Sequence, residues 1–136
     1  MSVQLTTGAV HHVSLTVADV ARSQQFYTEV LGFEVALEIP PAVLLSNGST
    51  IVGVHPAPNP DRALTDDRFD ENRVGLDHLA FTVDSRDELE RAKEIFDAAQ
   101  VPHGEIEDLG PALGLKMYVL FFRDPDNIQL ELCAMY

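Results

Sequence analysis

The chain contains the same short sequence pattern twice. Residues 10–19 read VHHVSLTVAD, and residues 76–84 read LDHLAFTVD. In each copy a histidine, His12 or His78, stands at the head of a segment in which apolar residues alternate with others, which is the pattern of a half-buried β-strand. The repeat indicates that the chain consists of two similar modules.

A helix is predicted after each copy of the pattern. Asp19 is placed to cap the first helix, and Gly32 lies where a left-handed C-terminal cap belongs. Ser85 and Glu88 have the spacing of a capping box at the start of the second helix. The predicted buried stripe of the second helix consists of Leu89, Ala92, Ile95 and Phe96.

Only strands are predicted after each helix. They cover residues 34–40, 42–47 and 49–56 in the first half, and residues 103–108, 113–124 and 127–135 in the second. The plan is therefore βαβββ twice within a single domain of residues 1–136. Module one covers residues 8–56 and module two covers residues 75–136. The polar, proline-marked segment 57–74 is a linker, and a loop of this length in a compact domain is usually functional or disordered.

Three stretches, taken in order, resemble the vicinal oxygen chelate superfamily: HHVSLTVAD…FYTEVLGFEV, GLDHLAFTVD and FFRDPDNIQLEL. This superfamily includes glyoxalase I, extradiol dioxygenases, fosfomycin-resistance enzymes and bleomycin-resistance proteins. The resemblance extends from about Val10 to Cys133. It implies an α+β fold in which two βαβββ modules form a curled, U-shaped mixed sheet around a site. Because this fold carries many reactions, the reaction has to be argued from the site residues.

Strand alternation and the resemblance together indicate three candidate metal ligands. It places His12, His78 and Glu131 on the faces opposite the wholly apolar ones, which should pack under the helices. Two imidazoles and one carboxylate suit Fe²⁺, Mn²⁺, Zn²⁺ or Ni²⁺ and leave coordination positions open. A lone strand histidine is usually a core or rim residue, but the resemblance puts ligands at these same three positions. We therefore predict one divalent metal ion held by His12, His78 and Glu131.

Other residues disfavour particular reactions of the superfamily. Family members with glyoxalase I activity carry a fourth ligand late in the first half, where this chain has Gly53, which offers no donor atom. Many extradiol and fosfomycin enzymes place a tyrosine ten residues before the glutamate ligand, and here that residue is Phe121. We expect Ser14, Gly53 and Phe121 to line the substrate pocket, and His55 to be a candidate catalytic group that transfers protons.

Two functions of different classes remain open. The first is a metal-dependent enzyme, either a lyase or isomerase or a dioxygenase, which acts on a small oxygen-bearing substrate and is not a classical glyoxalase I. The second is an antibiotic- or metabolite-sequestering protein of the bleomycin-resistance type. Fosfomycin resistance is disfavoured because a phosphonate needs a cluster of cationic groups, and only Lys116 and Arg123 lie close before Glu131. The intact triad favours the enzyme, whereas the acidic charge fits the sequestering protein.

Charge and composition limit the partners. The chain has 9 Lys and Arg against 22 Asp and Glu, a net charge of −13, which disfavours binding to nucleic acid and to anionic membranes. No apolar run is long enough to span a membrane. One cysteine, Cys133, cannot form an internal disulfide, so we expect a cytoplasmic protein.

The linker sequence also allows a prediction of the oligomeric state. Leu64, Phe69 and Val74 are apolar residues in an otherwise charged segment, which suits a lid or a contact surface. We therefore predict a homodimer with this segment at the groove mouth or at the interface. The alternative is a solvated loop on a monomer.

Overall fold

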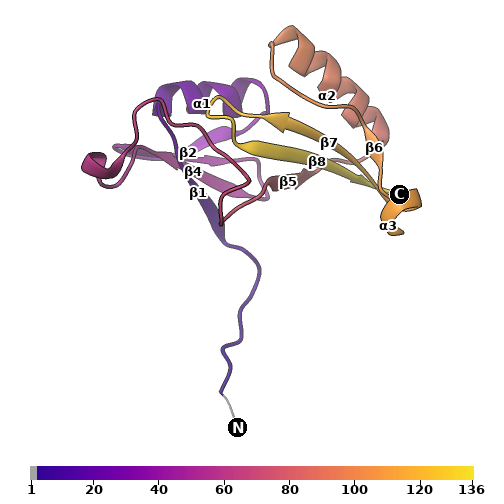
Figure 1. Ribbon diagram of the computed structural model, residues 1–136, viewed down its shortest axis with the longest axis horizontal. Coiled ribbons are helices and arrows are strands. Elements are labelled where there is room, and N and C mark those ends of the chain that lie inside the picture. The colour runs from indigo at the N-terminus through magenta and orange to yellow at the C-terminus, as the bar shows by residue number, and fades with distance from the viewer. Residues whose placement is uncertain (1–2) are drawn as a thin grey trace. The chain divides into compact units, whose positions relative to one another are not determined.

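The computed structural model describes residues 3–136, which divide into two compact units (Figure 1). The first unit ends at Asp61 and the second begins at Arg62. The predicted α+β class and the βαβββ order are confirmed in both. The elements of the first unit are β1 (His12–Thr16), α1 (Val20–Glu29), β2 (Glu34–Ile39), β3 (Ala42–Ser46) and β4 (Ile51–His55).

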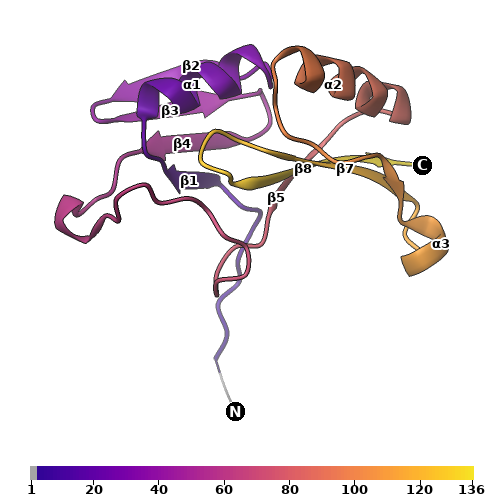
Figure 2. The same cartoon turned by 45° about the horizontal axis from the view of Figure 1, so that its top comes forward.

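The first unit contains a four-stranded sheet with the order β1-β4-β3-β2. β1 runs parallel to β4, and the other neighbours are antiparallel. Figure 2 shows α1 along one face of this sheet. The core lies between them and is formed by residues of both, including Leu15, Val17, Phe26, Tyr27, Leu45, Val52 and Val54. Burial of one face of β1 leaves the face that carries His12 and Ser14 exposed.

The second unit repeats this arrangement. Its sheet has the order β5-β8-β7-β6, again with the first strand parallel to the last and α2 packed against one face. The short 3₁₀ helix η1 (Pro60–Arg62) lies at the boundary between the units. The elements that follow are β5 (Leu79–Thr82), α2 (Arg86–Ala98), β6 (Glu107–Asp108), α3 (Gly110–Leu113), β7 (Met117–Arg123) and β8 (Gln129–Met135).

The helix predictions were correct in part. Asp19 caps α1, since its Oδ1 accepts a hydrogen bond from the Arg22 backbone N–H at 3.1 Å, and Gly32 adopts a left-handed φ of 73°. Ser85 precedes α2, but its side chain makes no capping hydrogen bond, and its backbone carbonyl accepts from Glu88 instead. The predicted capping box is therefore wrong.

The buried stripe of α2 is narrower than predicted. Leu89, Ala92 and Phe96 are buried, whereas the side chain of Ile95 is 39% exposed. At about 100° per residue Ile95 lies roughly a quarter turn from the centre of the stripe, so it lies at its edge. The helix α3 was not predicted, since it lies where one predicted strand, 103–108, is followed by the next, 113–124. Proline near a helix start and a left-handed Gly114 at its end are both compatible with this short helix.

Part of the linker is bound to the turn between β7 and β8. The Phe69 backbone N–H donates to the Asp126 carbonyl at 2.9 Å, and the Asn127 side-chain amide donates to the Phe69 carbonyl at 3.0 Å. Leu64 and Val74 are exposed, so of the three apolar linker residues only Phe69 is half-buried. Within residues 3–136, no helix has the length and apolar character needed to span a bilayer.

Candidate functional site

The first unit presents a row of polar positions on the open face of its sheet. The parallel register sets Ser14 beside Gly53 and Thr16 beside His55, and residues paired in this way point to the same side of the sheet. His12, at the head of the row, is exposed. His55 is half-buried, and its Nδ1 lies 2.8 Å from the carbonyl oxygen of Pro56. Because that oxygen can only accept, Nδ1 carries the proton, and in the neutral imidazole Nε2 of His55 is an acceptor.

His12 has a second imidazole as its neighbour. Its Nδ1 lies 2.9 Å from Nδ1 of His11, and the two rings are nearly perpendicular, with centroids 5.1 Å apart. One of these nitrogens donates to the other. When His12 is the donor, its Nε2 keeps a lone pair that is available to a metal ion.

The space beside Gly53 is largely filled by its neighbours. A Cβ atom at this position would lie 3.1 Å from Oγ of Ser14 and 3.1 Å from Cδ2 of Leu44. Both distances are tighter than ordinary van der Waals contacts, so even a methyl group there would require its neighbours to move. The contact with Ser14 shows that the missing side chain would point to the open face of β1 and β4.

In the second unit, two of the predicted ligands come together. Nε2 of His78 lies 3.4 Å from Oε2 of Glu131. His78 stands directly before β5, and the pairing of β5 with β8 sets Ala80 beside Glu131. Glu131 is buried and His78 is half-buried. Phe121 pairs with Glu131 across β7 and β8, and its ring lies nearly perpendicular to that of His78, with centroids 5.3 Å apart.

The second oxygen of Glu131 is bound by a thiol. Sγ of Cys133 lies 2.6 Å from Oε1 of Glu131. Burial, and then the neighbouring carboxylate, raise the pKa of the Cys133 thiol to about 12, so it is protonated at neutral pH and donates the hydrogen bond. Sequence reasoning did not find this contact. The signal for this contact was that both residues lie on one face of β8, two positions apart.

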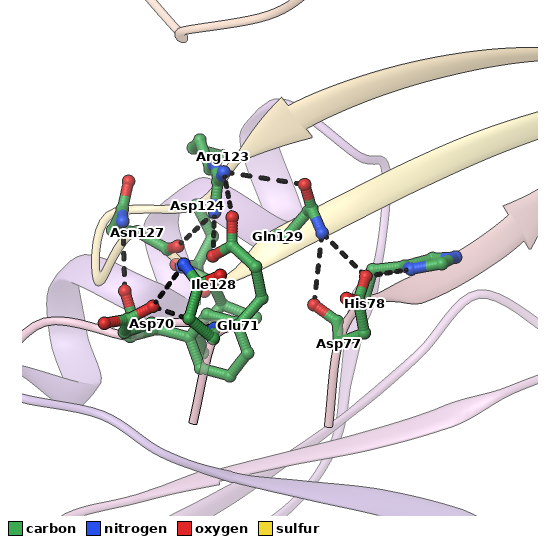
Figure 3. Close-up of polar contacts among 11 residues, drawn as sticks. Asp70, Glu71, Asp77, His78, Arg123, Asp124, Asn127, Ile128 and Gln129 are labelled. Atoms are coloured by element: carbon green, nitrogen blue, oxygen red, sulfur yellow. Dashed lines mark hydrogen bonds and ion pairs between the residues drawn. The ribbon is translucent and has the colours of Figure 1, made fainter. Parts of the chain in front are cut away.

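Sequence reasoning missed the groups that support His78 through its second ring nitrogen, Nδ1. Oδ1 of Asp77 lies 2.7 Å from Nδ1 of His78, and Gln129 donates to the same oxygen at 2.9 Å (Figure 3). A carboxylate acceptor fixes the proton on Nδ1 and leaves Nε2 as the free donor atom for a metal. The available signal was the Asp-His dipeptide at the head of the second repeat, which was used only for its histidine.

The second unit supplies two side chains whose donor atoms fit a metal site, one fewer than the three predicted ligands. Asp77 binds Nδ1 of His78 and Cys133 binds Oε1 of Glu131, so the remaining Nε2 and Oε2 atoms face each other. Borderline divalent ions accept this nitrogen and oxygen combination. Of the predicted triad, the structure brings together His78 and Glu131, while His12 belongs to the first unit. Neither unit, over residues 3–136, contains by itself a group of three His, Cys, Asp or Glu side chains that could hold an ion.

The remaining predicted site residues are also divided between the two units. Ser14, Gly53 and His55 share a face in the first unit, and Phe121 lies against His78 in the second. Each unit thus places its own candidates on the face of its sheet opposite the helix.

Comparison with known proteins identifies the family. The model of the Glyoxalase/Bleomycin resistance protein/Dioxygenase superfamily matches residues 9–132. The uncharacterized protein YwkD of Bacillus subtilis is 31% identical over 131 residues, which cover 91% of this chain and 94% of YwkD.

Comparison with solved structures gives the same result. A glyoxylase/bleomycin resistance protein/dioxygenase domain from Frankia sp. has a TM-score of 0.73 at 30% identity, and the match covers 96% of this chain and 94% of that one. Lactoylglutathione lyase from Agrobacterium tumefaciens shares the fold, with a TM-score of 0.71 at 23% identity over 94% of each chain. The chain therefore belongs to the glyoxalase/bleomycin resistance protein/dioxygenase superfamily, the vicinal oxygen chelate proteins.

Proposed function

We propose that this protein is a metal-dependent enzyme in which His12, His78 and Glu131 hold one Fe²⁺, Mn²⁺, Zn²⁺ or Ni²⁺ ion and a small oxygen-bearing substrate binds beside it. The observation that carries the proposal is the 3.4 Å distance between Nε2 of His78 and Oε2 of Glu131. The other nitrogen of His78 and the other oxygen of Glu131 are each bound by a neighbouring side chain. Such support is typical of metal ligands.

The residues around the proposed site have distinct roles. A bound divalent ion supplies Lewis acidity to adjacent substrate oxygens. Nε2 of His55 can accept a substrate proton, since Nδ1 is already bound to the Pro56 carbonyl. Phe121 supplies an apolar wall next to His78. Gly53 offers no donor atom, so a reaction of the lyase, isomerase or dioxygenase type other than the classical glyoxalase I reaction is proposed.

The net charge of −13 favours a second candidate, a sequestering protein of the bleomycin-resistance type. A strongly acidic surface attracts bulky cationic ligands by long-range electrostatics. This function requires no metal ion. Metal binding therefore separates the two candidates more directly than a search for substrates.

The test is metal binding by the purified, chelator-treated protein. Titration with Zn²⁺ or Co²⁺ in a calorimeter should give one ion per chain for the native protein. His12→Ala, His78→Ala and Glu131→Gln should each weaken binding by more than the roughly 10–100-fold that loss of a supporting group costs. His103→Gln is the matched control, since this imidazole is bound to Asp97 instead. Native binding by all three ligand variants would refute the metal site and favour sequestration.

A further inference from the structure

A continuous row of side chains connects the linker to His78 (Figure 3). Starting from His78, its members are Asp77, Gln129, Arg123 and Glu71, and consecutive members are in polar contact. We infer that these four residues, here called the anchor row, position the imidazole of His78, so that attachment of the linker to the β7–β8 turn controls metal affinity. This inference rests on the proposed metal site.

The first contact of the anchor row determines which nitrogen of His78 is free. Oδ1 of Asp77 accepts from Nδ1 of His78 at 2.7 Å, which leaves the lone pair on Nε2. The Asp77 side chain is 67% exposed, so packing alone does not hold it in place. A carboxylate this exposed would spend part of its time away from the imidazole unless a second group fixed it.

Gln129 is that second group. Its side-chain amide nitrogen donates to Oδ1 of Asp77 at 2.9 Å and to the Asp77 backbone carbonyl at 3.2 Å. The amide oxygen therefore faces the other way, where Nη2 of Arg123 lies 3.5 Å from it. An amide suits this position because it donates at one end and accepts at the other. A carboxylate here would repel Asp77.

The far end of the anchor row is a two-point ion pair with the linker. Nη2 and Nη1 of Arg123 donate to the two carboxylate oxygens of Glu71 at 2.7 and 2.9 Å, and Nη1 also reaches the Asn127 carbonyl at 3.2 Å. The Arg123 guanidinium lowers the pKa of Glu71 to about 2, so the pair is ionised at neutral pH. Two parallel hydrogen bonds fix the plane of the guanidinium and thereby the direction of its contact with Gln129.

Glu71 lies two residues after Phe69, whose backbone is bound to the same turn. The linker is therefore attached to the β7–β8 turn and the end of β7 at two points, and one of them, the ion pair of Glu71 with Arg123, belongs to the anchor row. When the linker moves away from the turn, Arg123 loses its carboxylate partner and the support of Asp77 weakens. Metal affinity should then fall although no ligand has changed.

The test measures the affinity for Co²⁺ and the visible absorption spectrum of the Co²⁺ protein, which reports coordination geometry. Asp77→Ala should weaken binding about 10–100-fold and alter the spectrum. Gln129→Ala and Glu71→Gln should weaken it by successively smaller factors. Glu94→Gln, which removes one exposed carboxylate of α2, is the matched control and should change neither quantity. Native affinity and spectrum in Asp77→Ala would overturn the inference.

A double-mutant cycle tests whether the row acts through Asp77. Glu71→Gln should weaken Co²⁺ binding in the native background and have no effect in the Asp77→Ala background. Additive effects of the two changes would overturn the connected row. His78→Ala distinguishes failure of the anchor row from failure of the proposed function, since normal Co²⁺ binding by that variant refutes the proposed function itself. Loss of binding by His78→Ala together with native binding by Asp77→Ala refutes the anchor row alone.

Discussion

The thiol of Cys133 lies 2.6 Å from Oε1 of Glu131, on the same face of β8. Both residues are buried, and the pKa of the thiol is raised to about 12, first by burial and then by the carboxylate. The thiol therefore acts as a hydrogen-bond donor that holds one oxygen of a proposed ligand. It does not act as a nucleophile, which would require the thiolate.

The first prediction concerns the reactivity of Cys133. With a thiol pKa near 12 and a buried side chain, the native protein should react with an aromatic disulfide reagent at pH 7 far more slowly than a free thiol does. The rate should rise to that of a free thiol in denaturant. Absorbance of the released aromatic thiolate measures both rates, and rapid labelling of the folded protein would contradict the assignment.

Replacement of Cys133 should separate packing from hydrogen bonding. Cys133→Ala leaves a buried oxygen of Glu131 without its donor and should lower the free energy of unfolding by about 1–3 kcal/mol. Cys133→Ser keeps a donor at the same place and should cost less. Urea unfolding of the three proteins measures the difference. Equal losses in both variants would indicate that the sulfur volume, and not the hydrogen bond, matters.

The contacts at Gly53 predict a cost for a small addition. Gly53→Ala places a methyl group 3.1 Å from Oγ of Ser14 and Cδ2 of Leu44, so we expect a loss of about 1 kcal/mol in the free energy of unfolding. Ser14→Ala should recover part of this loss in the double variant. Gly8→Ala is the control, since nothing lies within 4 Å of its added Cβ. A Gly53→Ala protein as stable as the native one would show that the neighbours move without cost.

The ion pair between Glu71 and Arg123 predicts a pH dependence. The pKa of Glu71 is lowered from 4.5 to about 2 in the folded protein, so the pair stabilises the fold above pH 4.5 and this contribution is lost as the pH falls from 4.5 towards 2. Glu71→Gln should thus be less stable than the native protein at pH 7, with a difference that shrinks through this range. Unfolding by urea at several pH values measures it, with Glu94→Gln as the control. A difference that stays constant with pH would refute the prediction.

Assembly remains a prediction from the linker. We expect a homodimer with residues 57–74 at the interface or at the groove mouth, because Leu64 is 62% exposed and Val74 is fully exposed within one chain. Sedimentation at micromolar concentration should give the mass of a dimer, and Leu64→Lys with Val74→Lys should shift it towards the monomer. Leu113→Lys, also at an exposed leucine, is the control. A native protein that sediments as a monomer would refute the dimer.

The repeat in the sequence predicted the strands and helices well, because each element follows from a local pattern. Alternation needs only neighbouring residues, and in β1 and β5 it correctly separated the buried face from the exposed one. In β8 both faces are buried, so alternation there did not by itself distinguish the face that carries Glu131. The Asp19 cap is local in the same sense. These predictions required no knowledge of which strands pair.

The supporting contacts could not be predicted in this way. Gln129 reaches Asp77, and Arg123 reaches Glu71, only because β5 pairs with β8 and the linker follows the β7–β8 turn. Both contacts depend on the register between segments that are 52 residues apart in the chain, and a local pattern does not determine such a register. The anchor row therefore became visible only in the structure.

The close contacts of Gly53 also affect how a related activity could evolve in such a chain. By the sequence resemblance, this strand position corresponds to the fourth ligand of glyoxalase I-like family members, so a change of Gly53 to glutamate would be the step that adds this ligand. The new side chain would begin 3.1 Å from Leu44 and Ser14. A change of Gly53 to glutamate alone would thus supply the donor atom at a position where Leu44 and Ser14 leave too little space for the side chain. A lineage would acquire the fourth ligand more readily after Leu44 or Ser14 had first been replaced by a smaller residue.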